Sequence, residues 1–149
     1  MSAGGVDDTV AVDSNVWIYT FDAELSEHAD VKPAMTELLS SDTALFVNTV
    51  IRLEVVHYLV KNLEKDADAD PTKFLNLDGV VSVPVTAEDV TRATEILTEH
   101  DDTGVGGRDA SLVATMDRND VSTLWTHDSG LKRLGDRLDR LEVHDPCVP

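Results

Sequence analysis

Two aspartates stand where a carboxylate can do chemistry in an α/β protein. Asp13 directly follows the apolar run Val10–Val12, and Asp128 follows the run Leu124–Thr126 after one residue. Both therefore stand just past the carboxyl end of an expected buried strand, where open α/β sheets bind ligands at the point of strand-order reversal. Either residue alone is more readily explained as a turn residue or a helix N-cap. Two such positions in one small sheet favour a site.

A glutamate in an expected helix is the third acidic residue of interest. Glu54 lies in the segment Thr49–Val60, which is apolar nearly all round. Such a helix is expected to be mostly buried, and a buried carboxylate needs a partner or a metal. Arg52 and Lys61 are poorly placed by helical spacing to form a salt bridge with it, whereas His57 at i+3 is a possible hydrogen-bond partner. The pattern favours a functional role for Glu54.

Asp109 is the fourth acidic residue, and it begins an expected helix. Leu112, Val113 and Met116 follow it at i+3, i+4 and i+7, so Asp109 shares the face that packs inward. The alternative is a first-turn aspartate that complements the helix dipole. Two carboxylates about 4 Å apart repel by about 4 kcal/mol at an effective dielectric of about 20. Four of them in one pocket therefore require a cation, and all-oxygen ligation selects Mg²⁺ or Mn²⁺.

The elements that would position these residues alternate between strands and helices. Strands are expected at Val10–Val12, Ala44–Val47, Val80–Val83, Thr123–Thr126 and Arg140–Val143. Helices are expected at about 26–39, 49–63, 71–77, 86–100, 108–118 and 129–134, with a charged loop at 61–70 and a Gly-rich turn at 101–107. Ser26 and Thr49 are the expected N-caps of two helices, and Thr86 with Asp89 forms an expected capping pair. This alternation predicts an α/β fold around a parallel sheet.

Length and composition predict one domain. The 149 residues fit a single domain at 9–149, preceded by a short mobile tail at 1–8 that lacks the features of a secretory signal. No apolar run reaches the ~18 residues of a membrane span, so a cytoplasmic protein is expected. The single cysteine, Cys147, excludes an internal disulfide and a CxxC zinc pair. His144 and Cys147 could be two metal ligands, but a thiol on a C-terminal tail is the simpler interpretation.

The charge balance is strongly acidic. There are 29 acidic and 12 basic residues, which gives a formal net charge of −17. The excess of aspartate resembles proteins from the salt-rich cytoplasm of halophilic archaea, where dense carboxylates keep the chain soluble. The Debye length in molar salt is only about 3 Å, so this charge does not exclude a nucleic-acid partner. Local basic patches and bound metal would have to supply the attraction.

The segments around the four carboxylates carry a family resemblance. They resemble the four motifs of the PIN-domain family, in order, at Val12–Tyr19, Asn48–Val55, Gly107–Thr115 and Thr126–Leu131. The resemblance covers about residues 9–143. It departs mildly at Ser14, where threonine is common, and after Asp128, where the usual aromatic residue is absent. Neither departure removes a carboxylate.

The resemblance implies a fold, an activity and a set of site residues. The fold is a three-layer α/β/α arrangement with a central parallel sheet of about five strands. The activity is that of an endoribonuclease dependent on Mg²⁺ or Mn²⁺, in which metal-activated water hydrolyses an RNA phosphodiester. The implied metal ligands and catalytic residues are Asp13, Glu54, Asp109 and Asp128, with Ser14, Asn15 and Thr126 as supporting residues.

The single compact domain is most similar to the VapC-type toxins. Those proteins are usually homodimers held inactive by a small antitoxin, whose basic segment enters the acidic site. Two alternatives are a catalytically silent PIN domain that binds RNA or protein as a scaffold, and a PIN nuclease of RNA processing. A Mg²⁺-dependent phosphatase or receiver domain is disfavoured, because no lysine stands at a strand end.

A basic segment near the C-terminus is a further candidate. Lys132, Arg133, Arg137 and Arg140 fall within nine positions and alternate with leucines. The simplest interpretation is the polar face of an amphipathic helix. The segment directly follows Asp128, however, so it is also a candidate to hold RNA phosphates. The predicted RNA-binding residues are Arg108, Lys132, Arg133 and Arg137.

Overall fold

Five strands form one sheet in the computed structural model, which describes residues 9–63 and 71–148. The strands are β1 (Thr9–Val12), β2 (Ala44–Asn48), β3 (Val80–Val83), β4 (Thr123–Trp125) and β5 (Glu142–His144). Their order is β3-β2-β1-β4-β5, and every neighbouring pair is parallel. The predicted α/β fold with about five parallel strands is confirmed. The expected tail at 1–8 and most of the expected loop at 61–70 lie outside the described residues.

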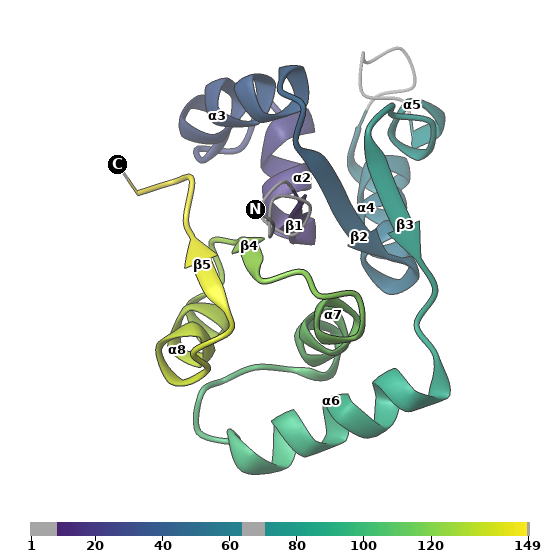
Figure 1. Cartoon of the computed structure of the whole chain (residues 1–149). Coiled ribbons are helices and arrows are strands. Elements are labelled where there is room, and N and C mark those ends of the chain that lie inside the picture. Colours follow the sequence, from purple (N-terminus) through teal and green to yellow (C-terminus); the bar gives the residue numbers. More distant parts are fainter. Residues whose placement is uncertain (1–8, 64–70, 149) are drawn as a thin grey trace.

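The described residues form seven helices around this sheet. They are α2 (Ser14–Phe21), α3 (His28–Ser40), α4 (Thr49–Asn62), α5 (Pro71–Leu75), α6 (Ala87–Glu99), α7 (Gly107–Arg118) and α8 (Ser129–Arg137). The pair α2 and α3 lies on one side of the sheet, and the pair α6 and α7 lies on the other (Figure 1). This gives the three layers that were expected. No helix in the described ranges is both long and apolar enough to cross a membrane.

The central strand β1 shows why the sheet is buried on both faces. Val10, Ala11 and Val12 are all buried, as a strand covered by helices on either side requires. Val12 pairs in register with Trp125 of β4, so β1 and β4 end at the same level. The residues that follow these strands are thereby brought to one edge of the sheet.

Several helix boundaries differ from the sequence-based expectation. Helix α2 was not predicted, because it begins immediately after β1 with Asp13 as its N-cap. Ser26 is not an N-cap, since α3 begins at His28 and the Ser26 hydroxyl donates to the Glu27 carboxylate. The N-cap of α4 is Asn48 rather than Thr49. By contrast, the capping pair predicted at the start of α6 is confirmed as a reciprocal capping box.

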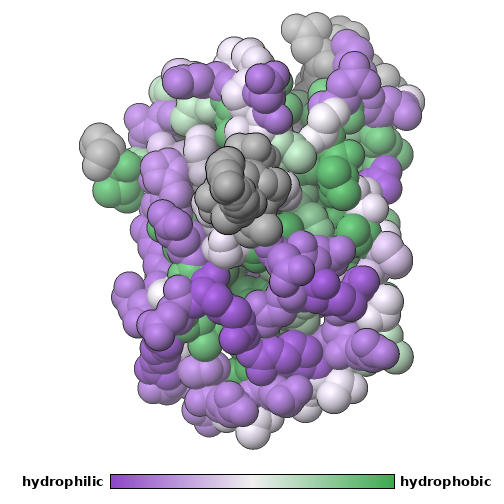
Figure 2. All heavy atoms as spheres, viewed as in Figure 1, coloured by the Kyte–Doolittle hydropathy of each residue, from purple (hydrophilic) through white to green (hydrophobic). Residues whose placement is uncertain are grey.

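The expectation that α4 is mostly buried is wrong. Only Ile51, Val55 and Leu59 of this helix are buried, whereas Leu53 is 70% exposed and Val60 is 64% exposed. Helix α4 therefore has one face in the core and a second apolar face on the surface. Figure 2 shows hydrophobic residues gathered on the side of the molecule that carries β3 and α5, while hydrophilic residues dominate over α6 and α8.

Candidate metal centre

Asp13 and Asp128 lie at the reversal point of the sheet. Strand β1 leads to β2 on one side, and β4 lies on its other side, so the residues after β1 and β4 border the position where α/β sheets bind ligands. Asp13 caps α2 by accepting a hydrogen bond from the Ser14 backbone N–H at 2.8 Å. Asp128 caps α8 by accepting from the Leu131 N–H at 2.9 Å. The capping roles considered from the sequence are real, and they hold both carboxylates at this edge.

Thr126 connects the two aspartates. Its hydroxyl donates to Asp13 Oδ2 at 2.7 Å and accepts from the Asp128 backbone N–H at 3.0 Å. Asn15 accepts a hydrogen bond from the His127 N–H at 3.4 Å through its side-chain oxygen, which ties the start of α2 to the loop after β4. Ser14 is buried beside Asp13. All three predicted supporting residues thus lie at the aspartates, with Thr126 making the most direct contact.

Glu54 of α4 lies close enough to Asp13 for its charge to act on that carboxylate, and it has an ion-pair partner. Arg108 at the start of α7 lies with Nη1 2.7 Å from Glu54 Oε2, and their side chains are 56% and 24% exposed respectively. The partner comes from a different helix, which helical spacing within α4 could not reveal, and it is not His57. Glu54 Oε1 is buried and has no hydrogen-bond partner in the part of the chain that the structure describes. One oxygen of this carboxylate therefore remains available to a ligand.

The electrostatics of the pocket reflect several carboxylates in one place. Burial raises the pKa of Asp13 to about 6. The hydrogen bonds from Thr126 and Ser14 lower this pKa, whereas the charges of Asp128 and Glu54 raise it further. Burial also raises the pKa of Asp109 to about 7, with the charges of Asp13 and Asp128 acting in the same direction and Arg108 opposing them. These mutual influences indicate that the four carboxylates lie near one another at this edge of the sheet. They are not drawn together as ligands, because within residues 9–63 and 71–148 the group with three potential ligand atoms within 4.8 Å of one another is His127, Asp145 and Cys147. The inward direction predicted for Asp109 agrees with the burial of Leu112, Val113 and Met116 behind it.

The pocket suits a hard divalent cation. Its charged donors are carboxylate oxygens, which Mg²⁺ and Mn²⁺ prefer. A cation would offset the burial and the mutual repulsion that together raise the pKa of Asp13 and Asp109, and it would provide a partner for Glu54 Oε1. The ligands would be Asp13, Glu54, Asp109 and Asp128.

Two residues that sequence reasoning missed support this pocket. Asn48 is fully buried, caps α4 through its side-chain oxygen, and donates from its amide nitrogen to Ser111 and Thr115 of α7. It thereby fixes the helix that carries Glu54 against the helix that carries Asp109. Gly130 is the second, because an added Cβ would lie 3.0 Å from Asp128 Oδ2. The available signals were an asparagine at the end of β2 and a glycine two residues after Asp128.

Replacing Asn48 with alanine is expected to lower the free energy of unfolding by about 2 kcal/mol, because a helix cap and two buried hydrogen bonds are lost together. Urea denaturation would measure the change. Asn62→Ala is the matched control, since the Asn62 amide is exposed and, within the described residues, donates to the Tyr58 carbonyl of its own helix. Equal losses in the two variants would contradict the bracing role of Asn48.

The predicted basic residues do not gather at the pocket as a group. Arg108 pairs with Glu54, Lys132 pairs with Asp145 and Arg137 pairs with Asp102. Arg133 donates to the Thr103 carbonyl at 2.8 Å and extends over Gly104. Arg140 pairs with Asp117, away from the pocket. Among the five, Arg108 and Arg133 remain closest to the carboxylates by these contacts.

The chain belongs to the PIN domain family, whose sequence model matches residues 10–137. No curated protein sequence matches it significantly. This membership agrees with the fold and with the order of the four motifs. It defines the class of protein as that of the PIN nucleases.

Solved structures of toxin proteins share this fold at low sequence identity. One is VapC20 of Mycobacterium tuberculosis, described as a toxin that cleaves the sarcin-ricin loop, with a TM-score of 0.72, 20% identity, and coverage of 85% of this chain and 95% of that one. A second is VapBC2 from Rickettsia felis bound to promoter DNA, with a TM-score of 0.63, 16% identity, and coverage of 92% and 98%. A third is FitAcB from Neisseria gonorrhoeae, with a TM-score of 0.67, 15% identity, and coverage of 94% and 99%.

Proposed function

We propose that the protein is a metal-dependent endoribonuclease and the toxin of a toxin–antitoxin pair. The observation that carries the nuclease proposal is that Asp13, Glu54, Asp109 and Asp128 lie near one another at the reversal point of the sheet, with Glu54 Oε1 buried and without a hydrogen-bond partner among the described residues. The similarity to VapC-type structures supports the toxin proposal. The test is RNA cleavage in Mg²⁺ or Mn²⁺ and its loss in EDTA. Cleavage that survives EDTA would overturn the metal-dependent mechanism.

In this proposal the chain supplies ligands and positioning rather than a nucleophile. Asp13, Glu54, Asp109 and Asp128 would hold Mg²⁺ or Mn²⁺, which when bound lowers the pKa of water and polarises the scissile phosphate. Thr126 fixes Asp13 by donating to Oδ2, and its orientation is set by the Asp128 N–H. These contacts leave Asp13 little freedom to turn away from the pocket.

Arg108 has two roles in the proposed function: it pairs with Glu54, and it binds an RNA phosphate. Its guanidinium neutralises Glu54 when no cation is bound. Because the Arg108 side chain is 56% exposed, it can leave Glu54 for an RNA phosphate without disturbing the core. Phosphate binding by arginine is strong because the planar guanidinium can donate two parallel hydrogen bonds.

The Arg133→Ala substitution is expected to weaken RNA binding more than Arg137→Ala. Arg133 extends over Gly104, whose carbonyl packs against Gly130 next to Asp128, whereas Arg137 is paired with Asp102. Loss of one phosphate contact reduces the slope of log affinity against log salt by about 1. Binding of an uncleaved RNA to the two variants at several salt concentrations measures this. An identical affinity and salt slope for both would remove Arg133 from the RNA path.

The exposed face of α4 supports a protein partner. Leu53, Val56 and Val60 line a shallow pocket that continues to Glu54 and Arg108. A segment bound along this face would therefore reach the acidic pocket, where a basic side chain would be attracted to the carboxylates. We propose that a small antitoxin with such a segment binds here and that the toxin is a homodimer. Light scattering tests the dimer, and a strictly monomeric protein at micromolar concentration would exclude it.

Two other functions are separable from this one. A catalytically silent PIN domain would bind RNA without cleaving it, but all four carboxylate positions are filled here. A PIN nuclease of RNA processing would cleave a precursor RNA and would not arrest growth when expressed. Expression of the chain alone in cells, compared with a variant lacking Asp13, distinguishes a toxin from a processing enzyme.

A further inference from the structure

A second group of potential metal ligands lies outside the carboxylate pocket. His127 belongs to the loop between β4 and α8, and Asp145 and Cys147 follow β5. One ligand atom of each residue lies within 4.8 Å of the ligand atoms of the other two. The histidine near Cys147 is therefore His127 and not His144, whose pairing with Cys147 was considered from the sequence and set aside there for a thiol on a C-terminal tail. The His144 ring instead packs on Trp125 with a centroid separation of 4.7 Å.

Asp145 is the centre of this group. The His127 Nδ1 atom lies 2.9 Å from Asp145 Oδ2, and the Cys147 backbone N–H donates to Asp145 Oδ1 at 2.9 Å. The Asp145 side chain is only 8% exposed, while that of His127 is 35% exposed. The carboxylate is thus held in place, and the group remains open to solvent through the histidine.

We propose that His127, Asp145 and Cys147 form a second metal site that takes a thiolate-binding divalent ion such as Zn²⁺. An imidazole, a carboxylate and a thiolate are the three donor types that zinc uses in proteins. In a tetrahedral zinc site, ligand atoms at about 2.0–2.3 Å from the metal are about 3.5 Å apart. The three donors, which lie within 4.8 Å of one another, therefore need to approach one another by no more than about 1.3 Å. The fourth position would be left for water.

The same three residue types also occur in cysteine nucleophiles assisted by histidine, but the local chemistry does not favour one. Burial and the neighbouring Asp145 raise the pKa of the Cys147 thiol to about 11. A catalytic cysteine needs the opposite shift, because the thiolate is the nucleophile. A bound divalent ion supplies the positive charge that a thiolate requires, and it displaces the thiol proton.

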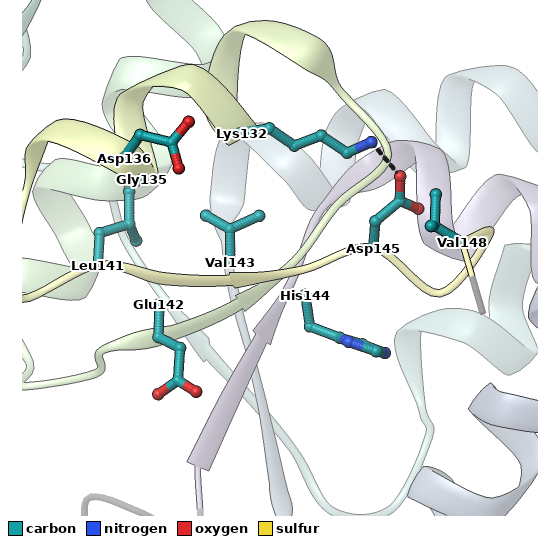
Figure 3. A pocket seen from close by; sticks show the side chains of 9 residues that line it. All are labelled: Lys132, Gly135, Asp136, Leu141, Glu142, Val143, His144, Asp145 and Val148. Carbon is teal, nitrogen blue, oxygen red and sulfur yellow. Dashed lines mark ion pairs between the residues drawn. The ribbon is translucent and has the colours of Figure 1, made fainter.

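Lys132 occupies the cation position when no metal is bound. Its ammonium group pairs with Asp145 Oδ2, and Figure 3 shows it reaching from α8 to Asp145 while His144 is directed to the other side of the chain. The Lys132 side chain is 37% exposed, so it can swing into solvent. A bound ion would replace this pair and tie the segment after β5 to the loop that carries Asp128. The second site therefore differs from the carboxylate site in its ligand atoms. It also differs in the side chain that competes with the ion, which is Lys132 here and Arg108 there.

Co²⁺ is the probe for this proposal, because a cobalt–thiolate bond gives a near-ultraviolet charge-transfer band that carboxylate ligands do not give. The full-length Asp13→Asn variant is titrated with Co²⁺, so that the carboxylate pocket contributes little binding. We expect the charge-transfer band to rise to one equivalent and to disappear on addition of excess Zn²⁺. The Cys147→Ser and His127→Gln substitutions should each abolish it, while the matched control His144→Gln should retain it.

Lys132→Ala separates a metal site from a purely structural cluster. If Lys132 competes with the ion for Asp145, its removal should tighten Co²⁺ binding by about 5-fold, as expected for a partly exposed ion pair. Circular dichroism of each variant verifies that it is folded, and a variant that does not fold is replaced by titrating the wild-type chain with its thiol blocked by an alkylating reagent. Absence of the band in Asp13→Asn and in wild type, or its persistence without the Cys147 thiol, would overturn the proposal. Unchanged affinity in Lys132→Ala would overturn the competition.

Discussion

The Asp13→Asn variant is expected to lose about 1000-fold of RNA cleavage, because a metal ligand contributes several kcal/mol of charge stabilisation to the reaction. Its metal-free form is expected to be more stable than the wild type at pH 8. These two effects have opposite signs and the same cause. Without a bound cation, an ionised carboxylate among other buried acidic groups lowers the stability of the protein. With a cation bound, the same carboxylate serves the reaction as a metal ligand.

The gain in stability follows from the raised pKa of Asp13. Its ordinary value is 3.8 and the folded value is about 6, so at pH 8 the ionised folded state is penalised by about 3 kcal/mol. The asparagine amide removes this penalty but cannot accept both the Ser14 N–H and the Thr126 hydroxyl, which costs about 1 kcal/mol. The expected net gain is about 2 kcal/mol.

Two measurements check this prediction. Cleavage of RNA in Mn²⁺ reports the loss of function, and urea denaturation in EDTA reports the gain in stability. Asp42→Asn is the matched control, because Asp42 is exposed in the turn between α3 and β2. Cleavage by Asp13→Asn at the level of this control would refute the metal-ligand role. A metal-free Asp13→Asn variant less stable than wild type would refute the electrostatic account of the pocket.

The sequence was sufficient for the residues that follow strands and for those that share a helical face. Asp13 and Asp128 could be found because parallel strands bring their carboxyl ends to one edge. Asp109 could be found because apolar residues at i+3, i+4 and i+7 define an inward face. In each case a local pattern and a general rule about packing were enough to predict the place of the side chain.

Contacts between helices were beyond the reach of these patterns. The Arg108–Glu54 ion pair joins α7 to α4, and its formation depends on how the two helices pack rather than on spacing within either one. The same holds for Asn48, whose amide reaches Ser111 and Thr115. Chain-local signals identify a cap, but they do not identify what else the capping side chain contacts.

The exposure of α4 could not be predicted for a different reason. Apolar residues all round a helix indicate burial, but hydropathy does not distinguish burial in the core from burial against another chain. Leu53 and Val60 are exposed in the single chain, and exposed apolar residues of this kind fit the partner surface proposed above.

In EDTA, the wild-type protein is expected to lose stability as the pH rises from about 5 to 8. The pKa of Asp13 and the pKa of Asp109 are both raised on folding, to about 6 and about 7. Between about pH 4 and pH 7 the folded state therefore holds protons that the unfolded chain has released. Stability falls with pH wherever the folded state binds more protons. The stability contributed by the two protonated carboxyl groups is fully present below their ordinary pKa of 3.8. It is lost as the pH rises past their pKa values in the folded protein, about 6 and about 7.

Mn²⁺ is expected to reverse this trend. The cation competes with the same protons, so its binding tightens as Asp13 and Asp109 ionise, and it stabilises the folded state by mass action. Thermal denaturation with and without Mn²⁺ at the two pH values measures both effects. The shift caused by Mn²⁺ should be larger at pH 8 than at pH 5, and Asp13→Asn should show a smaller dependence. A metal-free protein whose Tm rises from pH 5 to pH 8 would contradict the predicted sign.

High salt distinguishes the pH dependence of stability that arises in the carboxylate pocket from the pH dependence that arises at the acidic surface. The net charge of −17 also disfavours the folded state as carboxylates ionise, but that repulsion acts between exposed groups and is screened in molar KCl, where the Debye length is about 3 Å. Asp13 is 2% exposed, and its interactions with the other carboxylates are screened much less. The loss of stability between pH 5 and 8 should therefore persist in molar KCl if it arises in the pocket. If the loss of stability between pH 5 and pH 8 disappears in molar KCl, it arises from the exposed surface charges instead.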